Sequence, residues 1–200
     1  MLIWINGAFG VGKTTTAHEL ARRLPGAVVC DPETVGFGLQ HAIPRGIVRP
    51  DFQDLPAWRA GVVEVLDHVL SHHDGPVVAP MTVVVDAYLE ELLGGLRDRG
   101  HEVVHVALLA DRTTITRRLR GRGIPGVAAD PWALAQLDRC LAALSRPPYA
   151  VQVSTEGRSV RAVVDEVARV AGVTLLPDTD NRVRGWVRRR AVSLRHLRMG

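Results

Sequence analysis

Lysine is almost absent from this sequence of 200 residues. Of its 25 basic residues only Lys13 is a lysine, and the other 24 are arginines. An ammonium group is slimmer than a guanidinium and acts as a compact point charge, so the two groups are not interchangeable where space is tight. We therefore expect Lys13 to have a specific chemical role.

Acidic residues are absent from one end of the chain. Residues 181–200 hold seven arginines and no aspartate or glutamate, whereas residues 1–180 hold 18 basic against 21 acidic residues, a net charge of −3. The overall formal charge of +4 is therefore a property of the last twenty residues. A nucleic-acid-binding domain carries its basic surface on the folded domain itself, so we expect no nucleic-acid partner for residues 1–180.

Cysteines and long apolar runs are also scarce. Cys30 and Cys140 are too few and too isolated for a disulfide framework or a metal cluster, and we expect two buried, reduced thiols. No stretch approaches the roughly 18 apolar residues that span a bilayer. The short apolar run over residues 2–5 follows no positively charged leader, so we expect a cytoplasmic protein.

Short apolar runs alternate along the chain with segments of helical periodicity. The expected strands are residues 1–5, 27–30, 76–79, 102–109 and 149–154. The expected helices are residues 14–24, 57–71, 86–99, 111–122, 131–144 and 160–170, with Asp86 as a helix cap and residues 36–56 irregular. This alternation predicts one three-layer α/β domain over residues 1–177, in which helices cover both faces of a five-stranded parallel sheet, and a separate tail over residues 178–200.

A glycine-rich loop lies between the first expected strand and the first expected helix. Residues 7–14 read Gly-Ala-Phe-Gly-Val-Gly-Lys-Thr and match the phosphate-loop pattern at every fixed position. Backbone N–H groups of such a loop wrap phosphate oxygens, the lysine reaches the β- and γ-phosphates, and the threonine hydroxyl binds Mg²⁺. We expect ATP and Mg²⁺ to bind here, with Lys13 catalytic and Thr14 as the metal ligand. The expected nucleotide-binding residues are Gly7, Ala8, Phe9, Gly10, Val11, Gly12, Lys13, Thr14 and Thr15.

Four arginines, Arg117, Arg118, Arg120 and Arg122, precede a loop rich in glycine and proline. Such a segment, here about residues 112–130, can close as a lid that excludes water and stabilises charge on the transferred phosphoryl group. We expect Arg118 and Arg122 to be catalytic. The alternative is a solvated surface helix in an arginine-rich protein.

Asp31 ends the second expected strand, at the edge of the sheet where the glycine loop also lies. A carboxylate there could accept the proton of an acceptor hydroxyl or hold a water bound to Mg²⁺, and Glu33 follows two residues later. Asp31 could equally be a turn former before Pro32.

Residues 36–60 combine aromatic and basic side chains, which favours an acceptor-binding segment. Aromatic faces could stack on a base or sugar, and guanidinium groups could pair with phosphate or carboxylate; the aromatic residues could equally anchor a long loop. The expected acceptor-binding residues are Asp31, Glu33, Phe37, Phe52, Gln53, Trp58 and Arg59.

The third strand is not followed by the aspartate that motor ATPases and GTPases use for magnesium. It runs instead into Ala79-Pro80-Met81-Thr82, which argues against those classes. No motif for guanine is visible, so ATP is the expected phosphoryl donor.

Several segments together resemble the tunicamycin-resistance family of P-loop kinase-like proteins, within the nucleoside-monophosphate-kinase group. They are residues 3–14, Asp31-Pro32-Glu33 with Gly36-Phe37, residues 51–56 with Trp58-Arg59, Pro80-Met81-Thr82, and residues 118–123. The resemblance implies a sheet ordered 2-3-1-4-5, binding of ATP and Mg²⁺, and resistance to tunicamycin, a nucleoside antibiotic. It also implies that Arg118 stacks on adenine, that Arg122 reaches the phosphates and that residues 154–157 frame the adenine.

These features indicate an Mg-ATP-dependent phosphotransferase whose acceptor is a small molecule, either the drug or a related uridine nucleotide or nucleotide-sugar. The alternative is an ATP-binding protein that sequesters tunicamycin at a membrane without chemistry. Residues 182–198 form a basic amphipathic pattern, which could contact an anionic membrane peripherally, dock on the domain, or bind nucleic acid.

Overall fold

The sheet of this protein is built from five parallel strands. The computed structural model describes residues 1–44, 46–47, 49–121, 131–146 and 151–178. The strands are β1 (Leu2–Gly7), β2 (Val28–Val29), β3 (Val77–Pro80), β4 (Val103–Leu109) and β5 (Val151–Ser154). Their order is β2-β3-β1-β4-β5, and every neighbouring pair is parallel, which confirms the predicted fold class and sheet order.

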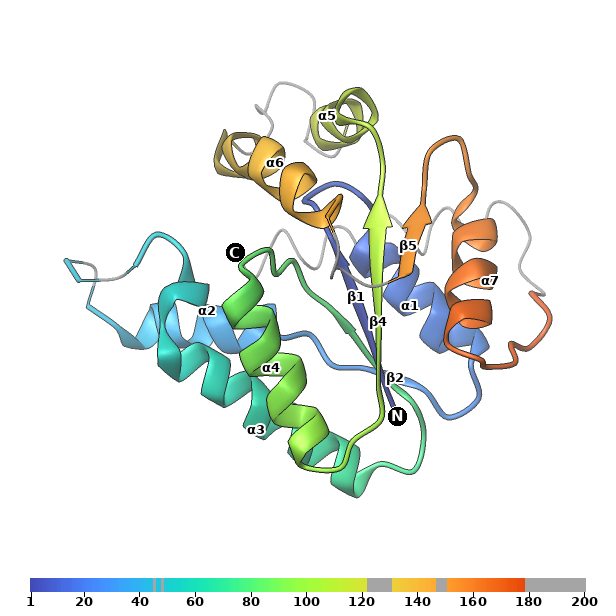
Figure 1. Cartoon of the computed structure of the whole chain (residues 1–200), viewed down its shortest axis with the longest axis horizontal. Coiled ribbons are helices and arrows are strands. Elements are labelled where there is room, and N and C mark those ends of the chain that lie inside the picture. Colours follow the sequence, from blue (N-terminus) through green and yellow to red (C-terminus); the bar gives the residue numbers. More distant parts are fainter. Residues whose placement is uncertain (45, 48, 122–130, 147–150, 179–200) are drawn as a thin grey trace.

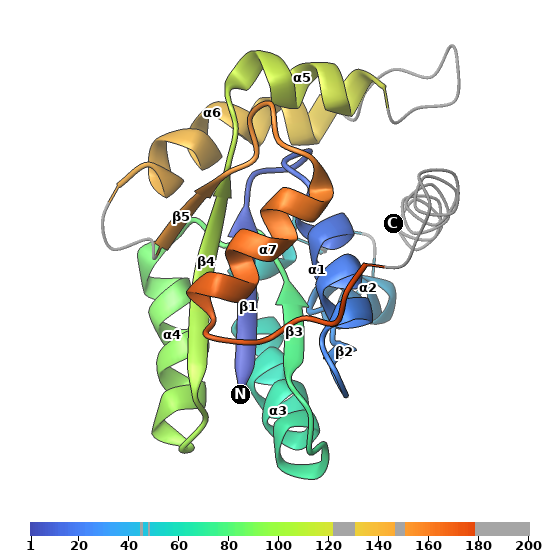
Figure 2. The ribbon, with the colours of Figure 1, turned by 90° about the vertical axis from the view of Figure 1, so that its right-hand side faces the viewer.

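Helices cover both faces of the sheet (Figures 1 and 2). They are α1 (Lys13–Arg23), α2 (Glu33–Ala42), α3 (Pro56–His72), α4 (Asp86–Asp98), α5 (Arg112–Arg120), α6 (Pro131–Leu144) and α7 (Val160–Val170), with a short 3-10 helix η1 (Phe52–Asp54). Helices α1 and α7 pack together on one face, and α3 and α4 pack together on the other. Helices α5 and α6 lie beyond the carboxyl ends of the strands, where a ligand would bind in an open α/β sheet.

The core is centred on β1. All six residues of this strand are buried, because β1 has a neighbouring strand on each side and a helix layer on each face. Helix α7 contributes one apolar face, on which Val163, Val164 and Val167 are buried. This arrangement holds the loop that leaves β1 on a rigid support.

The two edge strands differ from their predictions. The sequence predicts a buried strand over residues 27–30, but β2 has two residues and Val28 is 36% exposed. Residues 149–154 are likewise predicted to be buried, yet Val153 alone is buried in β5 and Val151 is 52% exposed. An edge strand has only one neighbouring strand, so an apolar run does not guarantee burial there.

Helix α2 lies in a stretch that the sequence predicts to be irregular from residue 36 onward. Gly36 and Gly38 lie inside this helix, and Gly36 is buried beneath the Phe52 ring. A Cβ atom at position 36 would lie 2.6 Å from that ring, so the glycine serves close packing rather than a turn. Helix α4 does begin at Asp86, but the residue at its N-cap position is Val85, so Asp86 lies in the first turn of the helix, where it forms an ion pair with Arg146 at 3.5 Å.

The last described residues pack against α1. Leu176 N donates to Arg23 O (2.8 Å), and the Arg22 guanidinium donates to Asp178 Oδ1 (2.7 Å), so Asp178 contacts the domain although the sequence assigns it to the tail. The remaining tail, residues 179–200, and residues 122–130 of the predicted lid lie outside the described residues. Cys140 is buried and Cys30 is half-buried, and neither forms a disulfide. Within the described ranges, no helix is both long and apolar enough to cross a membrane.

Candidate functional site

The loop between β1 and α1 has a backbone that requires glycine. Gly7 and Gly10 have φ values of 152° and 83°. A Cβ atom would lie 2.7 Å from Val11 Cγ1 at position 7 and 2.8 Å from Leu119 Cγ at position 10, so a side chain at either position would displace its neighbours. The loop is therefore held in one tight, inward-facing shape, as a phosphate-binding loop must be.

Lys13 is the first residue of α1 and is only 7% exposed. Its Nζ donates to Ala8 O (3.2 Å) and lies 5.4 Å from the centroid of the Phe9 ring. The lysine thus folds back across the loop, and the Thr14 and Thr15 side chains follow it in the first turn of the helix, both half-buried. No side chain caps the N-terminus of α1, where N–H groups and the helix dipole favour an anion.

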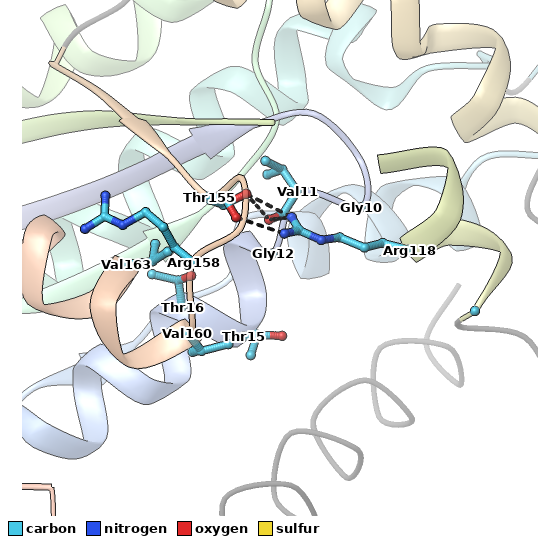
Figure 3. Close-up of a pocket in the computed structure, with 11 residues that line it drawn as sticks. Gly10, Val11, Gly12, Thr15, Thr16, Arg118, Thr155, Arg158, Val160 and Val163 are labelled. Atoms are coloured by element: carbon cyan, nitrogen blue, oxygen red, sulfur yellow. Dashed lines mark hydrogen bonds between the residues drawn. The ribbon is translucent and has the colours of Figure 1, made fainter. Parts of the chain in front are cut away.

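A cavity of about 400 Å³ lies beside this loop (Figure 3). Its lining joins three parts of the chain that are distant in sequence: the phosphate loop with the start of α1, the end of α5, and the loop after β5 with the beginning of α7. The lining residues are Gly10, Val11, Gly12, Thr15, Thr16, Arg118, Gly121, Thr155, Arg158, Val160 and Val163. Polar groups from the loop and apolar groups from α7 meet here, which suits a nucleotide with its phosphates on the loop and its base against the valines.

Arg118 crosses this cavity and joins two of its walls. Its Nη1 donates to Val11 O (3.1 Å) and to Thr155 Oγ1 (2.9 Å), and its Nη2 donates to Thr155 O (3.0 Å) (Figure 3). The structure thus brings Arg118 to the phosphate loop and to residues 154–157, the segment that the resemblance predicts to frame the adenine. Stacking of Arg118 on adenine stays a prediction.

The loop after β5 is fixed by a carboxylate that sequence reasoning missed. Glu156 accepts hydrogen bonds from Thr114 Oγ1 (2.7 Å) and from Asp111 N (3.2 Å), and these bonds, the former above all, lower the pKa of the Glu156 carboxyl. The start of α5 is therefore tied to the loop that bears Thr155. Glu156 and Thr114 lie 42 residues apart, so no local pattern could have shown the pairing.

Asp31 lies just after β2, where the sequence places it. Its Oδ1 accepts a hydrogen bond from Glu33 N (3.0 Å), which confirms that it forms a turn. Burial raises the pKa of the Asp31 carboxyl above its usual range, while that hydrogen bond and the charge of Lys13 act in the opposite direction. Asp31 therefore forms the turn and also lies within electrostatic reach of the buried lysine.

The aromatic side chains of residues 36–60 form a packed cluster. Phe52 contacts Trp58 at a centroid distance of 5.3 Å and Phe37 at 5.9 Å. Trp58 is fully buried, and its Nε1 donates to Pro32 O (3.2 Å). The prediction that Trp58 binds the acceptor is therefore wrong, because a buried ring offers no face to a ligand; Trp58 instead supports the turn of Asp31. Phe37 and Phe52 are half-buried.

Arg59 and Gln53 also point into the protein. Arg59 is 8% exposed; it pairs with Glu91 (2.5 Å), donates to Gln53 O (2.6 Å) and lies 4.2 Å from the Tyr88 ring centroid. Gln53 is 7% exposed, and its Nε2 donates to Thr82 O (2.9 Å). Both are predicted to contact the acceptor, but their polar groups are satisfied within the domain, so their role in the site is indirect.

Asp51 is a further acidic group, within electrostatic reach of α6, that the sequence did not single out. Burial raises the pKa of its carboxyl, and the charge of Arg139 in α6 lowers it. Burial also raises the pKa of the Cys140 thiol, on which the charges of Lys13 and Asp51 both act. Lys13 and Asp51 thus each lie within electrostatic reach of the middle of α6. Asp51 begins the Asp-Phe-Gln-Asp-Leu-Pro segment (residues 51–56), and this position was the sequence signal that could have identified it.

The side chains near the phosphate loop suit an Mg²⁺ ion that is bound jointly by the protein and by the nucleotide phosphates, rather than one that is held by the protein alone. The described part of the chain contains no group of three or more His, Cys, Asp or Glu side chains that could hold a metal ion. Thr14, at the start of α1 beside the phosphate loop, supplies one hydroxyl, and Mg²⁺ commonly takes its other ligands from phosphate and water. Arg122, the other predicted catalytic arginine, lies outside the described residues.

A parallel sheet whose first strand enters a glycine loop closed by a buried lysine defines a P-loop protein of the kinase-like type. A family model described as "AAA domain" matches residues 2–147. The chain belongs to this family, and it also belongs with the tunicamycin-resistance proteins, which have a P-loop kinase-like fold.

Solved structures show the same architecture. The tunicamycin resistance protein of Deinococcus radiodurans is 30% identical, with a TM-score of 0.73, covering 88% of this chain and 98% of that one. A gluconokinase from Sinorhizobium meliloti 1021 is 17% identical (TM-score 0.61, covering 85% and 90%). An APS kinase from Mycobacterium tuberculosis, in complex with AMPPNP and APS, is 18% identical (TM-score 0.54, covering 86% and 96%). No match was found among curated proteins.

Proposed function

We propose that this protein is an Mg-ATP-dependent phosphotransferase that acts on a hydroxyl group of a small, uncharged acceptor of the nucleoside-antibiotic type and thereby confers tunicamycin resistance. The observation that carries the proposal is that Lys13 and Asp31 lie within electrostatic reach of one another. Lys13 is a buried cation on the phosphate loop whose charge acts on the Asp31 carboxyl, and burial raises the pKa of that carboxyl. Kinase-like relatives and the tunicamycin resistance protein support the same reading.

Each of these residues has a separate role during phosphoryl transfer. Lys13 and the N–H groups of the phosphate loop bind the β- and γ-phosphates, and Mg²⁺ on the Thr14 hydroxyl supplies further positive charge. Asp31 accepts the proton of the acceptor hydroxyl as its oxygen forms a bond to the γ-phosphorus, while the bond to the β-phosphate oxygen breaks and ADP leaves. A raised pKa brings Asp31 closer to neutral pH, where a general base is most effective.

The residues expected to surround the acceptor favour a neutral molecule over a nucleotide. Asp31, Glu33, Asp51 and Asp54 lie within or just before residues 36–60, and carboxylates next to the acceptor would repel an acceptor phosphate. Arg59, one of the guanidinium groups predicted to pair with such a phosphate, is engaged by Glu91 instead. Nucleosides and sugars offer hydroxyl groups for carboxylates to bind, and they carry no phosphate.

Mass spectrometry after incubation with Mg-ATP tests the proposal. The panel holds tunicamycin, nucleosides, nucleotides and nucleotide-sugars; we expect one added phosphate on the neutral compounds and none on the phosphate-bearing ones. If no compound in the panel is phosphorylated, the kinase proposal is wrong. Phosphorylation of the nucleotides alone contradicts the acceptor class.

An Asp31→Asn variant separates catalysis from drug sequestration. If Asp31 is the base, nucleotide affinity stays within about threefold while turnover falls roughly 10²- to 10⁴-fold. The wild-type rate should rise with pH through the raised pKa of Asp31, since only the carboxylate accepts a proton, and the variant should lack this rise. The exposed Asp98→Asn serves as the control. Protection against the drug that is unchanged in Asp31→Asn would indicate sequestration.

The role of residues 181–200 is a separate proposal. Their seven arginines and apolar stripe fit peripheral contact with an anionic membrane or docking on the domain. Deletion of these residues, followed by pelleting with anionic liposomes, decides between the two, because only membrane contact predicts a loss of pelleting. Binding to any DNA with a steep salt dependence would indicate nucleic acid instead.

A further inference from the structure

The segment after β3 is bound to the phosphate loop by side chains. The backbone pairing of β1 with β3 ends at Ile5 and Pro80, followed by one hydrogen bond from Met81 N to Ile5 O (3.1 Å). Beyond this point the Asn6 side chain continues the connection: its Oδ1 accepts from Val83 N (3.1 Å), and its Nδ2 donates to Val83 O (2.8 Å). Asn6 Oδ1 also accepts from Gly7 N (2.8 Å), so the first glycine of the loop is held in place.

Thr82 is the point where this segment contacts both halves of the site. Its Oγ1 donates to Gly7 O (2.8 Å), in the phosphate loop, and its own carbonyl accepts from Gln53 Nε2 (2.9 Å), in the acceptor segment (residues 36–60). Thr82 is 2% exposed and Gln53 is 7% exposed. Both bonds are thus shielded from water, where an unmade bond leaves a polar group without compensation.

The acceptor segment is fixed to the rest of the domain on the other side of Gln53. Asp51 Oδ1 accepts from Gln53 N (3.0 Å), and Gln53 O accepts from Arg59 Nη1 (2.6 Å). The Tyr88 ring beneath Arg59 carries a hydroxyl that donates to Asp54 (3.0 Å). A displacement of Asp51 therefore acts on Gln53 directly and, through Thr82, on Gly7.

We propose that Gln53 and Thr82 are positioning residues that couple the acceptor segment to the phosphate loop, so that the Gln53–Thr82 hydrogen bond contributes to nucleotide affinity from outside the nucleotide cavity. This inference rests on one part of the proposed function, namely that the phosphate loop binds ATP. Neither residue lines the cavity beside Arg118. The coupling orients Gly7 relative to Asp51 before either ligand arrives.

Titration calorimetry with Mg-ATP on the full chain tests this coupling. Thr82→Ser keeps the hydroxyl and should bind within twofold of the wild type. Thr82→Val removes the hydroxyl at nearly constant volume, and we expect binding about tenfold weaker, because Gly7 O loses its buried partner. Gln53→Leu should weaken binding about fivefold, and the double variant should bind no more weakly than Thr82→Val alone, since both substitutions break one connection.

A control for general destabilisation is Leu66→Val, which removes one buried methylene from α3, away from these contacts. If Gln53→Leu binds Mg-ATP within twofold of the wild type while its melting temperature falls as in Leu66→Val, Gln53 serves packing alone and the coupling is refuted. Fully additive effects in the double variant refute it as well.

Amide hydrogen exchange gives a readout without any ligand. We expect Gln53→Leu and Thr82→Val to accelerate exchange in residues 7–13, and Thr82→Ser to leave it unchanged. Unchanged exchange in both disruptive variants overturns the inference. A wild-type protein that fails to bind ATP, but shows these exchange differences, contradicts the proposed function and leaves the coupling supported.

Discussion

The Arg118 guanidinium is bonded twice to Thr155, through Nη1 to Oγ1 (2.9 Å) and through Nη2 to O (3.0 Å). This pair connects the end of α5 with the loop after β5, and a third bond to Val11 O extends the connection to the phosphate loop. Three segments that could move separately are thus joined by one planar side chain. Val11, Arg118 and Thr155 all line the cavity beside the phosphate loop.

Arg118→Lys is expected to weaken nucleotide binding by about tenfold. A lysine keeps the charge but cannot hold the bidentate geometry on Thr155, because its ammonium is a single point of donation. Calorimetric titration with Mg-ATP measures the effect. The control is Arg169→Lys, at an exposed pair with Glu166 in α7, which should bind like the wild type. Equal affinities in the two variants would show that charge alone matters at position 118.

Lys13→Arg is expected to abolish productive use of ATP, with phosphoryl transfer at least about 100-fold slower. The position is 7% exposed and its Nζ already contacts Ala8 O, so a wider planar guanidinium has no room without displacing the loop. Nucleotide binding and transfer to the acceptor are measured together. Arg97→Lys, an exposed charge-preserving exchange in α4, is the control. Near-normal transfer by Lys13→Arg would mean that positive charge alone suffices.

Two glycines of α2 should respond in opposite ways to alanine. At position 36 the new Cβ would lie 2.6 Å from the Phe52 ring, and overpacking of this kind typically costs about 1–3 kcal/mol of stability. At position 38 nothing lies within 4 Å, so alanine should stabilise the helix by roughly 0.5–1 kcal/mol. Thermal or urea unfolding of both variants tests the pair. A stabilising Gly36→Ala would show that Phe52 does not pack there as described.

The free energy of unfolding should decrease at acidic pH, because His105 binds a proton more readily in the unfolded chain than in the folded protein. Burial lowers the pKa of His105 to about 4, and the charge of Arg97 adds to the effect; the neutral ring lies 3.3 Å from Asn6 Nδ2. Below the unfolded pKa of about 6.5 the unfolded state binds the proton first, so stability is lost as pH falls from 6.5 towards 4, by at most about 3 kcal/mol.

Urea unfolding between pH 4 and 7 measures this contribution as a difference between proteins. His105→Gln should lose less stability than the wild type over that range, because it lacks the titrating ring. The exposed His72→Gln should follow the wild-type curve. Parallel curves for wild type and His105→Gln would exclude His105 as the source of the pH dependence.

The helices and the phosphate loop could be predicted because their signals are local. Helices α6 and α7 match their predictions at both ends, since apolar spacing and capping residues act over a few positions. The glycine loop was recognised because each of its residues has a fixed chemical task at a fixed spacing. Helix α2 was not predicted, because its glycines were read as part of an irregular stretch, whereas one of them makes room for Phe52.

The acceptor side could be predicted only in part. Composition indicated aromatic and basic side chains near Asp31, but it could not show that Trp58 and Arg59 point inward, because burial depends on α3 packing against α4 and α2. Asp51 stood in a recognisable segment, yet its proximity to Arg139 and Cys140 of α6 follows from segments far apart in the chain.

The sequence by itself determined the parallel α/β domain, the phosphate loop with its one lysine, and the position of Asp31 at the end of a strand. Each of these follows from periodicity or from a motif within a few residues. Only the tertiary structure decided that Arg118 bonds to Thr155, that Thr82 joins the phosphate loop to Gln53, and that Arg59 is withdrawn from the acceptor. These contacts join residues 29 or more positions apart, whose meeting depends on how the layers pack rather than on local propensity.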